Sequence, residues 1–291
     1  MIKFDNVSFL YNAGSSDEMK ALDGVSFEIG SHEFVGLLGH TGSGKSTLVQ
    51  HMNGLNIPSQ GKVYVNDRAT DDKDGDLRKI RQEVGLVFQY PEDQLFEDTI
   101  YKDIAFGPKN LKLDPEEIDT RVRNAMKSVG LDFEELKDRS PFELSGGQKR
   151  RVAIAGVLAL NPSYLVLDEP TAGLDPRGRE EILGEIGRLY KERENLSVIL
   201  VTHSMEDVAK HANRLLVMDK GRLIMDGRPK EIFSREEELE AIGLSLPAVT
   251  RLMRRLKKGG WDIDEKSLTV DEAVKSISAY LDTREGAKNE R

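Results

Sequence analysis

Residues 36–48, GLLGHTGSGKSTL, decide the fold of this chain. Gly39, Gly44, Lys45 and Ser46 stand at the spacing G-x-x-x-x-G-K-[ST], which places a glycine-rich loop between a buried strand and a helix. Glycine tolerates backbone angles that side chains forbid, so consecutive N–H groups of such a loop can converge on one anion. The helix that begins near Lys45 adds the positive end of its dipole. The stretch therefore predicts a phosphate-binding loop.

This phosphate-binding loop supplies most of the candidate nucleotide ligands. Lys45 is expected to reach the β- and γ-phosphates, and the Ser46 hydroxyl is expected to bind Mg²⁺. The competing interpretation is an ordinary strand-to-helix turn, but the apolar residues on both sides fit a buried strand and the inner face of a helix. The predicted cofactor-binding residues here are Gly39, His40, Thr41, Gly42, Ser43, Gly44, Lys45, Ser46 and Thr47.

The composition describes a highly charged globular protein. With 291 residues, 38% hydrophobic and 32% charged, the chain can hold about two domains and a sizeable core. Its longest apolar run, residues 152–160, is far shorter than the roughly 20 residues that span a bilayer, and the amino terminus does not read as a signal peptide. We therefore expect a cytoplasmic chain. The lack of cysteine excludes disulfides and thiol catalysis, and the net charge of −9 argues against a general nucleic-acid surface.

The chain begins with predicted antiparallel β-structure over residues 2–36, and further β-structure is expected at residues 61–67. Tyr11 lies just before the polar loop that joins the first two strands. Its ring can stack on a nucleotide base, or it can be a half-exposed strand residue, and the pattern alone does not separate these two interpretations. Residues 71–76 are expected to form a charged loop.

An apolar strand at residues 83–89 ends in Gln89. Open α/β sheets place ligands at the carboxyl ends of their strands, where this amide can offer its oxygen to Mg²⁺ or to an attacking water. From about residue 92 to residue 160, helical spacing replaces the strand pattern and indicates an inserted helical subdomain. Asp114 and Glu117 are expected to form a capping box within it.

A second candidate anion site is LSGGQ, residues 144–148, at the start of an apolar helix with a basic first turn. Small residues at a helix start leave the amides unobstructed, which favours an anion. The competing interpretation is a simple helix N-cap at Ser145. Because paired glycines add no capping benefit, we predict that this segment also contacts nucleotide, through Ser145, Gly146, Gly147 and Gln148.

Two further buried strands end in side chains suited to catalysis. YLVLDEP, residues 164–170, ends in Asp168, which is expected to hold Mg²⁺ directly or through water, and in Glu169. Glu169 is placed to orient and deprotonate an attacking water, although two surface acids at a strand end would give the same pattern. SVILVTHS, residues 197–204, brings His203 to a strand end, where it can contact the γ-phosphate or that water.

A lone histidine at a strand end is more often a hydrogen-bonded structural group. Here, however, Gln89, Glu169 and His203 each follow an apolar strand, so we expect them to meet at one edge of the sheet. Asp175, in TAGLDP, begins a later turn and can help to position the site of a neighbouring subunit. No side-chain role is predicted for the other histidines, which are His32, His40, His51 and His211.

The chain ends in a small helical extension. Residues 1–235 are expected to form the nucleotide-binding domain and residues 236–291 the extension, with a predicted role in dimerisation; the charge-rich residues 234–241 resemble a linker. Two amphipathic helices follow, the second capped by Thr269 and Glu272 and fraying after residue 282. Their apolar faces are predicted to carry Val249, Leu252, Met253 and Leu256, and Ala273, Val274, Ile277 and Leu281. The basic residues of the first helix are expected to be its solvated face rather than a nucleic-acid site.

Together these motifs resemble the ATP-binding-cassette (ABC) family over residues 1 to about 230. The resemblance implies an α/β P-loop NTPase fold with a parallel core sheet, an antiparallel β-subdomain and an inserted helical subdomain. It also implies that paired subunits sandwich two ATP molecules, with LSGGQ of one copy on the γ-phosphate held by the other. It assigns adenine stacking to Tyr11, Mg²⁺ contact to Gln89, catalysis to Glu169 and a γ-phosphate switch to His203.

A finer resemblance, in residues 88–111, in GRPKEIF and in the extension, is to the ATPases of energy-coupling-factor importers. It implies ATP-driven uptake of vitamins or transition-metal ions at the cytoplasmic face of a prokaryotic cell membrane. The implied partners are a second, often non-identical ABC ATPase, a transmembrane coupling protein and a substrate-binding membrane protein, with no nucleic acid. Residues 90–106 mix apolar and acidic side chains and are predicted to receive a helix of the coupling protein.

The main alternative is a soluble ABC ATPase acting in DNA repair or on ribosomes. Repair members of the family insert a long coiled coil, for which residues 45–143 leave no room, and translation members usually fuse two cassettes. A regulatory module that binds ATP without hydrolysis is disfavoured by the intact Glu169.

Overall fold

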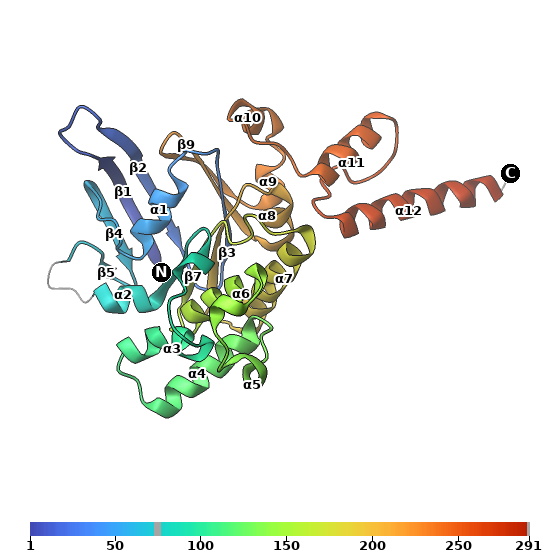
Figure 1. Ribbon diagram of the computed structural model, residues 1–291. Helices are drawn as coiled ribbons and strands as arrows, with labels where there is room; N and C mark the ends of the chain where they lie inside the picture. The colour runs from blue at the N-terminus through green and yellow to red at the C-terminus, as the bar shows by residue number, and fades with distance from the viewer. Residues whose placement is uncertain (73–76, 290–291) are drawn as a thin grey trace.

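The computed structural model describes residues 1–72 and 77–289, which form two sheets flanked by helices (Figure 1). Most of the charged loop predicted at residues 71–76 falls outside the described residues. Within them, no helix combines the length and the apolar character that a bilayer crossing requires.

The first sheet is antiparallel, as the alternating sequence predicted. Its strands lie in the order β2-β1-β4-β5 and are β1 (Ile2–Tyr11), β2 (Met19–Ile29), β4 (Gln60–Val65) and β5 (Arg68–Ala69). Alternate side chains of β1, including Ile2 and Phe4, are almost fully buried. They share a hydrophobic core with Leu48 and Met52 of helix α1 (Lys45–Met52), so this sheet packs against the helix that follows the phosphate-binding loop.

The second sheet is mainly parallel and has the order β10-β9-β3-β8-β7-β6. Its strands are β3 (Phe34–Leu38), β6 (Val84–Val87), β7 (Tyr164–Asp168), β8 (Ser197–Val201), β9 (Arg214–Asp219) and β10 (Arg222–Gly227). The prediction of antiparallel structure up to residue 36 is wrong for residues 34–36, because β3 pairs parallel with β8 and β9. The physical reason is that FVGLL is a continuous apolar run, which is typical of a parallel strand buried on both faces.

A helical subdomain lies at about residues 92–160, where helical periodicity predicted it. It contains η1 (Pro91–Gln94), α3 (Ile100–Asn110), α4 (Pro115–Ser128), α5 (Phe133–Leu136), η2 (Pro141–Glu143) and α6 (Gly146–Leu158). Its apolar faces share one core with β6, β7 and β8. The capping box predicted for Asp114 and Glu117 is wrong: the Asp114 side chain makes no capping bond, and Glu117 accepts a hydrogen bond from Arg121 one turn later.

Further helices lie outside the helical subdomain and before the extension. They are α2 (Leu77–Glu83), α7 (Pro176–Glu192), α8 (Met205–His211) and α9 (Pro229–Ile232). Helix α8 packs on β3, with Val208 against Gly36 and Leu215.

The C-terminal extension differs from its predicted form at its start. Residues that resemble a linker form α10 (Glu236–Ala241), because Leu239 is fully buried in a core shared with Leu244, Leu246 and the α8–β9 region. Helices α11 (Ala248–Lys258) and α12 (Val270–Asn289) follow and share a small separate core around Met253. The expected fraying after Asp282 is not observed, since α12 continues to Asn289. These two helices project from the rest of the chain (Figure 1).

Candidate active site

The phosphate-binding loop joins β3 to α1 and needs its glycines for reasons internal to this chain. Gly39 and Gly44 have φ angles of 153° and 101°. A Cβ atom added to Gly39 would lie 2.4 Å from the Met218 carbonyl oxygen, and one added to Gly44 would lie 2.5 Å from the Ala21 carbonyl oxygen. Only glycine fits both the backbone angle and the space, so the surrounding strands fix the shape of the loop.

Lys45 lies folded over this loop. Its ammonium group donates hydrogen bonds to the carbonyl oxygens of Gly39 at 2.7 Å and His40 at 2.9 Å. Burial lowers the pKa of Lys45, and the nearby carboxylates of Glu169 and Asp168 oppose that shift. A buried cation at a helix start suits a phosphate anion.

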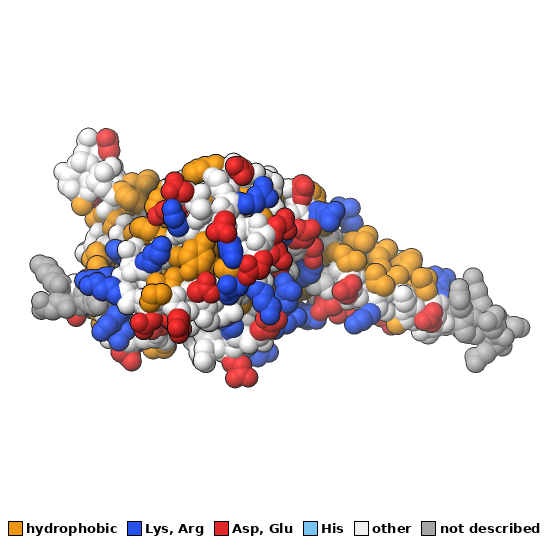
Figure 2. Space-filling model, turned by 60° about the horizontal axis from the view of Figure 1, so that its bottom comes forward, with side chains coloured by type: hydrophobic (Ala, Val, Ile, Leu, Met, Phe, Trp, Pro, Cys, Tyr) orange, Lys and Arg blue, Asp and Glu red, His pale blue; other side chains and the backbone are white. Residues whose placement is uncertain are grey.

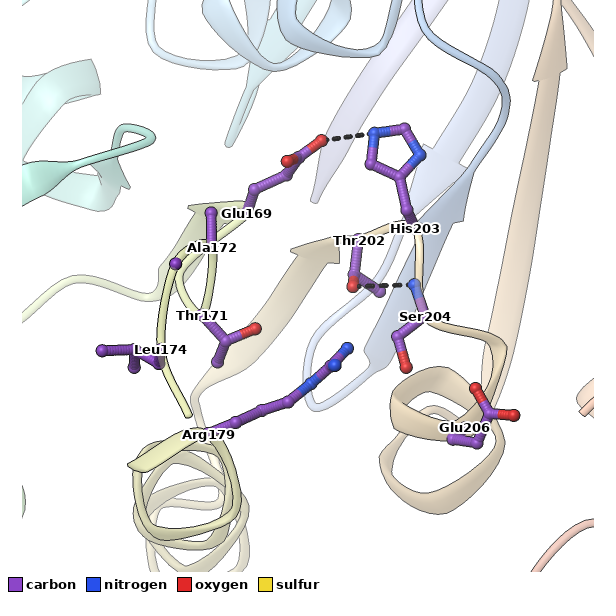
Figure 3. Close-up of a pocket in the computed structure, with 10 residues that line it drawn as sticks. Glu169, Thr171, Ala172, Leu174, Arg179, Thr202, His203, Ser204 and Glu206 are labelled. Carbon is purple, nitrogen blue, oxygen red and sulfur yellow. Dashed lines mark hydrogen bonds and ion pairs between the residues drawn. The ribbon is translucent and has the colours of Figure 1, made fainter. Parts of the chain in front are cut away.

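Two open cavities share Glu169 and His203, and the second of them brings the separated motifs together. The first, whose lining residues Figure 3 shows, has a volume of about 410 Å³, and the second has a volume of about 370 Å³. The second cavity is lined by Met19, Lys20, Ala21, Thr41, Gly42, Gly44, Lys45, Ser46, Thr47, Gln89, Glu169 and His203. The prediction that Gln89, Glu169 and His203 meet at one edge of the sheet is therefore confirmed, and they lie beside the phosphate-binding loop, while their catalytic roles stay predictions.

Glu169 is the centre of this cluster. It directly follows β7, with a left-handed φ of 49°, and its amide donates to the Val201 carbonyl oxygen of β8. The Nε2 atom of His203 lies 2.6 Å from Glu169 Oε1, a contact that Figure 3 marks with a dashed line, and Gln89 Nε2 donates to Glu169 Oε2 at 3.3 Å. Both carboxylate oxygens are thus oriented by neighbours from two other strand ends, and the carboxylate stays accessible enough to accept a proton from a water.

The oxygen ligands expected for Mg²⁺ also lie together. Asp168, the last residue of β7, is buried, and burial raises the pKa of its carboxyl group while the Ser46 hydroxyl bonds to it and lowers that pKa. Because Gln89 turns its amide nitrogen to Glu169, its oxygen remains available. A hydroxyl, a carboxylate and an amide oxygen form the donor set that Mg²⁺ prefers, and a cation would offset the cost of the buried Asp168 charge.

The LSGGQ segment forms the cap of α6. Ser145 Oγ accepts from the Gln148 amide at 3.3 Å, and the Gln148 side-chain oxygen accepts from the Ser145 amide at 3.2 Å. The N-cap interpretation of Ser145 is therefore confirmed, whereas its nucleotide contact stays a prediction. Gly146 and Gly147 differ from the phosphate-loop glycines Gly39 and Gly44, because in the described part of the chain a Cβ added to either would meet no neighbouring atom within 4 Å. None of residues 145–148 lines the cavity of the phosphate-binding loop.

Tyr11 and Asp175 make contacts within the chain that leave their predicted roles untested. The Tyr11 hydroxyl lies 3.2 Å from Thr47 Oγ1, so its ring stands beside the phosphate-binding loop, although it is not among the lining residues of the cavity. Asp175 is the N-cap of α7 and accepts from the Gly178 amide at 2.7 Å. Its role toward a neighbouring subunit stays a prediction.

Sequence reasoning missed several residues of the site. Met19, Lys20 and Ala21 line the cavity because β2 pairs with β1 and returns beside Tyr11. Only the pairing of the first two strands could have indicated this. His40 also has an unpredicted partner, since its Nε2 atom lies 2.8 Å from Asp219 Oδ1 at the end of β9.

Comparison with known proteins agrees with this geometry. The ABC transporter family matches residues 22–172. The chain is 57% identical over 276 residues to the energy-coupling factor transporter ATP-binding protein EcfA2 of Clostridium tetani, covering 95% of this chain and 96% of that protein. It is 54% identical over 288 residues to the protein of the same name from Caldanaerobacter subterraneus subsp. tengcongensis, covering 99% of each.

Two solved structures share the fold. CbiO1 from Clostridium perfringens, described as part of the ABC transporter complex cbiONQ, superposes with a TM-score of 0.72 at 41% identity, covering 87% of this chain and 98% of that chain. The ATP-binding cassette MJ0796, in a dimeric post-hydrolysis state bound to ADP and Pi, gives a TM-score of 0.69 at 32% identity, covering 79% and 99%.

Proposed function

The chain belongs to the ABC transporter family of ATP-binding, ATP-hydrolysing subunits, and from that premise we propose that it is one of two ATPases that power an energy-coupling factor importer. The proposed cargo is a vitamin or a transition-metal ion, brought in through membrane partner subunits. The observation that carries this proposal is the match to energy-coupling factor ATP-binding proteins over 95% of the chain, which includes the extension as well as the nucleotide-binding region.

In the proposed mechanism, the loop from Gly39 to Thr47 and the Lys45 ammonium hold the phosphates. Glu169 accepts a proton from the attacking water, since its carboxylate faces the cavity of the phosphate-binding loop. His203 and Gln89 hold that carboxylate from two sides and can sense the γ-phosphate. Bound Mg²⁺, held by Ser46, Asp168 and Gln89, would neutralise phosphate charge.

We propose that the second half of each site comes from the partner ATPase. The signature residues Ser145 to Gln148 lie outside the cavity of their own chain, and the two glycines of the segment have open space in front of them. Open glycines at a helix start leave amides free for an anion brought by another subunit. A dimeric ABC cassette among the related structures supports this arrangement.

The proposed contact with the transmembrane coupling protein lies between Tyr90 and Phe106. The structure separates the apolar residues of this segment into two groups: Leu95, Ile100 and Ile104 are buried, whereas Phe96 and Phe106 are 58% and 44% exposed. The two exposed rings pack edge to face with centroids 5.0 Å apart. Exposed aromatic pairs of this kind are typical anchors for a partner helix.

We also propose that the C-terminal extension joins the two ATPases. Four apolar side chains of α11 and α12 are exposed, and Figure 2 shows hydrophobic side chains gathered on this part of the surface. They are Leu252, Val270, Val274 and Leu281. Such a group on a projecting unit favours a protein contact. The charged residues between these apolar side chains would set how the extensions of the two ATPases align.

The test is purification from solubilised membranes with identification of the bound chains, combined with uptake measurements in cells. Phe96→Arg should reduce both co-purification of membrane subunits and substrate uptake, while ATP binding by the isolated chain stays unchanged. Ile224→Arg is the matched control, because Ile224 is an exposed apolar residue on β10, outside the helical subdomain. Equal loss of ATP binding in Phe96→Arg would make Phe96 a folding residue, and full uptake would contradict the proposed docking segment.

A further inference from the structure

His51 is a buried ionisable residue that the proposed mechanism does not use. It lies in the last turn of α1 with no exposed surface. Its Nδ1 atom donates to the Thr47 carbonyl oxygen at 2.7 Å, and its Nε2 atom has no hydrogen-bond partner among the described residues. Burial lowers the pKa of His51, which keeps the ring neutral. A buried polar atom without a partner is costly, so the ring needs another explanation.

The ring of His51 packs against Phe9 of β1. The ring centroids are 4.7 Å apart and the planes meet at 78°. Phe9 in turn packs edge to face against Tyr11, with centroids 4.9 Å apart and planes at 87°. Phe9 and Tyr11 lie two residues apart on one face of the strand, so a single row of three rings runs from the buried helix α1 to the edge of the nucleotide cavity.

The two end members of this row, Tyr11 and His51, both contact Thr47. The Tyr11 hydroxyl lies 3.2 Å from Thr47 Oγ1, and His51 holds the carbonyl oxygen of the same residue. Strand pairing holds the Tyr11 backbone opposite Met19 of β2, although the register of β1 with β2 shifts on both sides of Phe9. Backbone pairing does not orient the Tyr11 ring, so its orientation depends on the side-chain contacts with Phe9 and Thr47.

We propose that His51 is a positioning residue for the nucleotide base, holding the Tyr11 ring through Phe9. The hydrogen bond to Thr47 fixes the orientation of the imidazole, the imidazole fixes Phe9, and Phe9 fixes Tyr11. This inference rests on the proposed role of Tyr11 as the base-stacking residue. Edge-to-face ring pairs contribute enough to change a binding constant about two- to tenfold.

The experiment is a double-mutant cycle measured by calorimetry on the full chain, with ATP and inorganic tripolyphosphate as the two ligands. His51→Asn keeps a donor at the Nδ1 position but removes the ring. It should weaken ATP binding about two- to tenfold and leave tripolyphosphate binding unchanged, because only ATP carries a base. Tyr11→Ala should weaken ATP binding more, and the double variant should bind ATP no more weakly than Tyr11→Ala alone.

His51→Phe is the matched control, because it loses the hydrogen bond to Thr47 but keeps a ring against Phe9, and it should therefore retain most of the preference for ATP. Equal weakening of both ligands in His51→Asn, additive losses in the double variant, or a loss in His51→Phe as large as in His51→Asn would each overturn the proposal. If His51→Asn fails to fold, Phe9→Leu at a half-buried position replaces it with the same expected outcome. Unchanged ATP affinity in Tyr11→Ala would instead contradict base stacking, which is a failure of the proposed function.

Discussion

The two glycine-containing loops of this protein differ in what holds them. In the phosphate-binding loop, Gly39 and Gly44 are required by carbonyl oxygens of the same chain that lie within 2.5 Å of any added Cβ. In the LSGGQ segment, Gly146 and Gly147 have neither a left-handed φ nor a close neighbour among the described residues. The first loop is shaped by contacts within the chain, whereas no contact among the described residues requires the glycines of the second. This difference supports the proposal that one chain carries two halves of different sites.

The largest expected effect comes from removing the carboxylate that faces the phosphate-binding loop, which leaves the shape of that loop unchanged. Glu169→Gln should reduce ATP hydrolysis by about 10² to 10⁴, because the water loses its proton acceptor, while ATP binding is retained. Phosphate release from the assembled ATPase pair measures this. Glu206→Gln is the matched control, since Glu206 lines the neighbouring cavity and its amide oxygen can still accept from Ala248. Near-normal hydrolysis by Glu169→Gln would remove Glu169 from catalysis.

A smaller effect is expected on ATP binding, and it should differ between the lysine of the phosphate-binding loop and the lysine that follows LSGGQ. Lys45→Ala should weaken ATP binding by the isolated chain by about 1.5 to 3 kcal/mol, the usual contribution of a hydrogen bond to a charged group. Lys149→Ala, in the first turn of α6, should leave that binding unchanged, because Lys149 does not line the cavity. Equilibrium nucleotide titration checks both. A comparable loss in Lys149→Ala would mean that the two loops serve one chain.

Glycine substitutions in the two loops should differ in their effect on the free energy of unfolding. Gly44→Ala should lower the free energy of unfolding by about 1 to 3 kcal/mol, since its φ of 101° is unfavourable for alanine. Gly147→Ala, in open space within α6, should leave that free energy unchanged or raise it by up to about 1 kcal/mol. Denaturant unfolding of the nucleotide-free chain measures both. Equal destabilisation would show that the signature glycines are needed for folding.

The smallest expected effect concerns the extension. Val274→Glu, at a side chain that is 56% exposed, should weaken nucleotide-free pairing of the ATPases by about 1 kcal/mol, because burying a charge at an apolar contact is unfavourable. Lys275→Glu on the same helix is the control and should change pairing less. Sedimentation without nucleotide tests this. Pairing that is unaffected by Val274→Glu would place the contact elsewhere.

Much of the site could be predicted because its residues follow strands with continuous apolar runs. The parallel sheet then brings Gln89, Glu169 and His203 to one edge, whatever the length of the intervening chain. The predictions failed where tertiary contacts override a local pattern. Glu117 pairs with Arg121 rather than capping α4. The charge-rich residues 236–241 form α10 because Leu239 is buried in a hydrophobic core with Leu244 and Leu246.

Other features had no local signal in the sequence. Met19 and Lys20 reach the cavity only because β2 returns beside β1, and His51 contacts Phe9 only because α1 packs under the first sheet. Residues distant in sequence make these contacts. Periodicity within a single helix or strand therefore cannot predict them.

The most direct test of the central claim is light scattering of the Glu169→Gln ATPase pair during ATP and Mg²⁺ titration, with and without Ser145→Arg. The claim is that LSGGQ completes the site of another chain. We expect ATP to drive closed association in Glu169→Gln alone. Adding Ser145→Arg should block this association, while the phosphate-binding loop of the same chain binds ATP with unchanged affinity. ATP-driven association that persists fully in the Ser145→Arg variant would contradict the shared site.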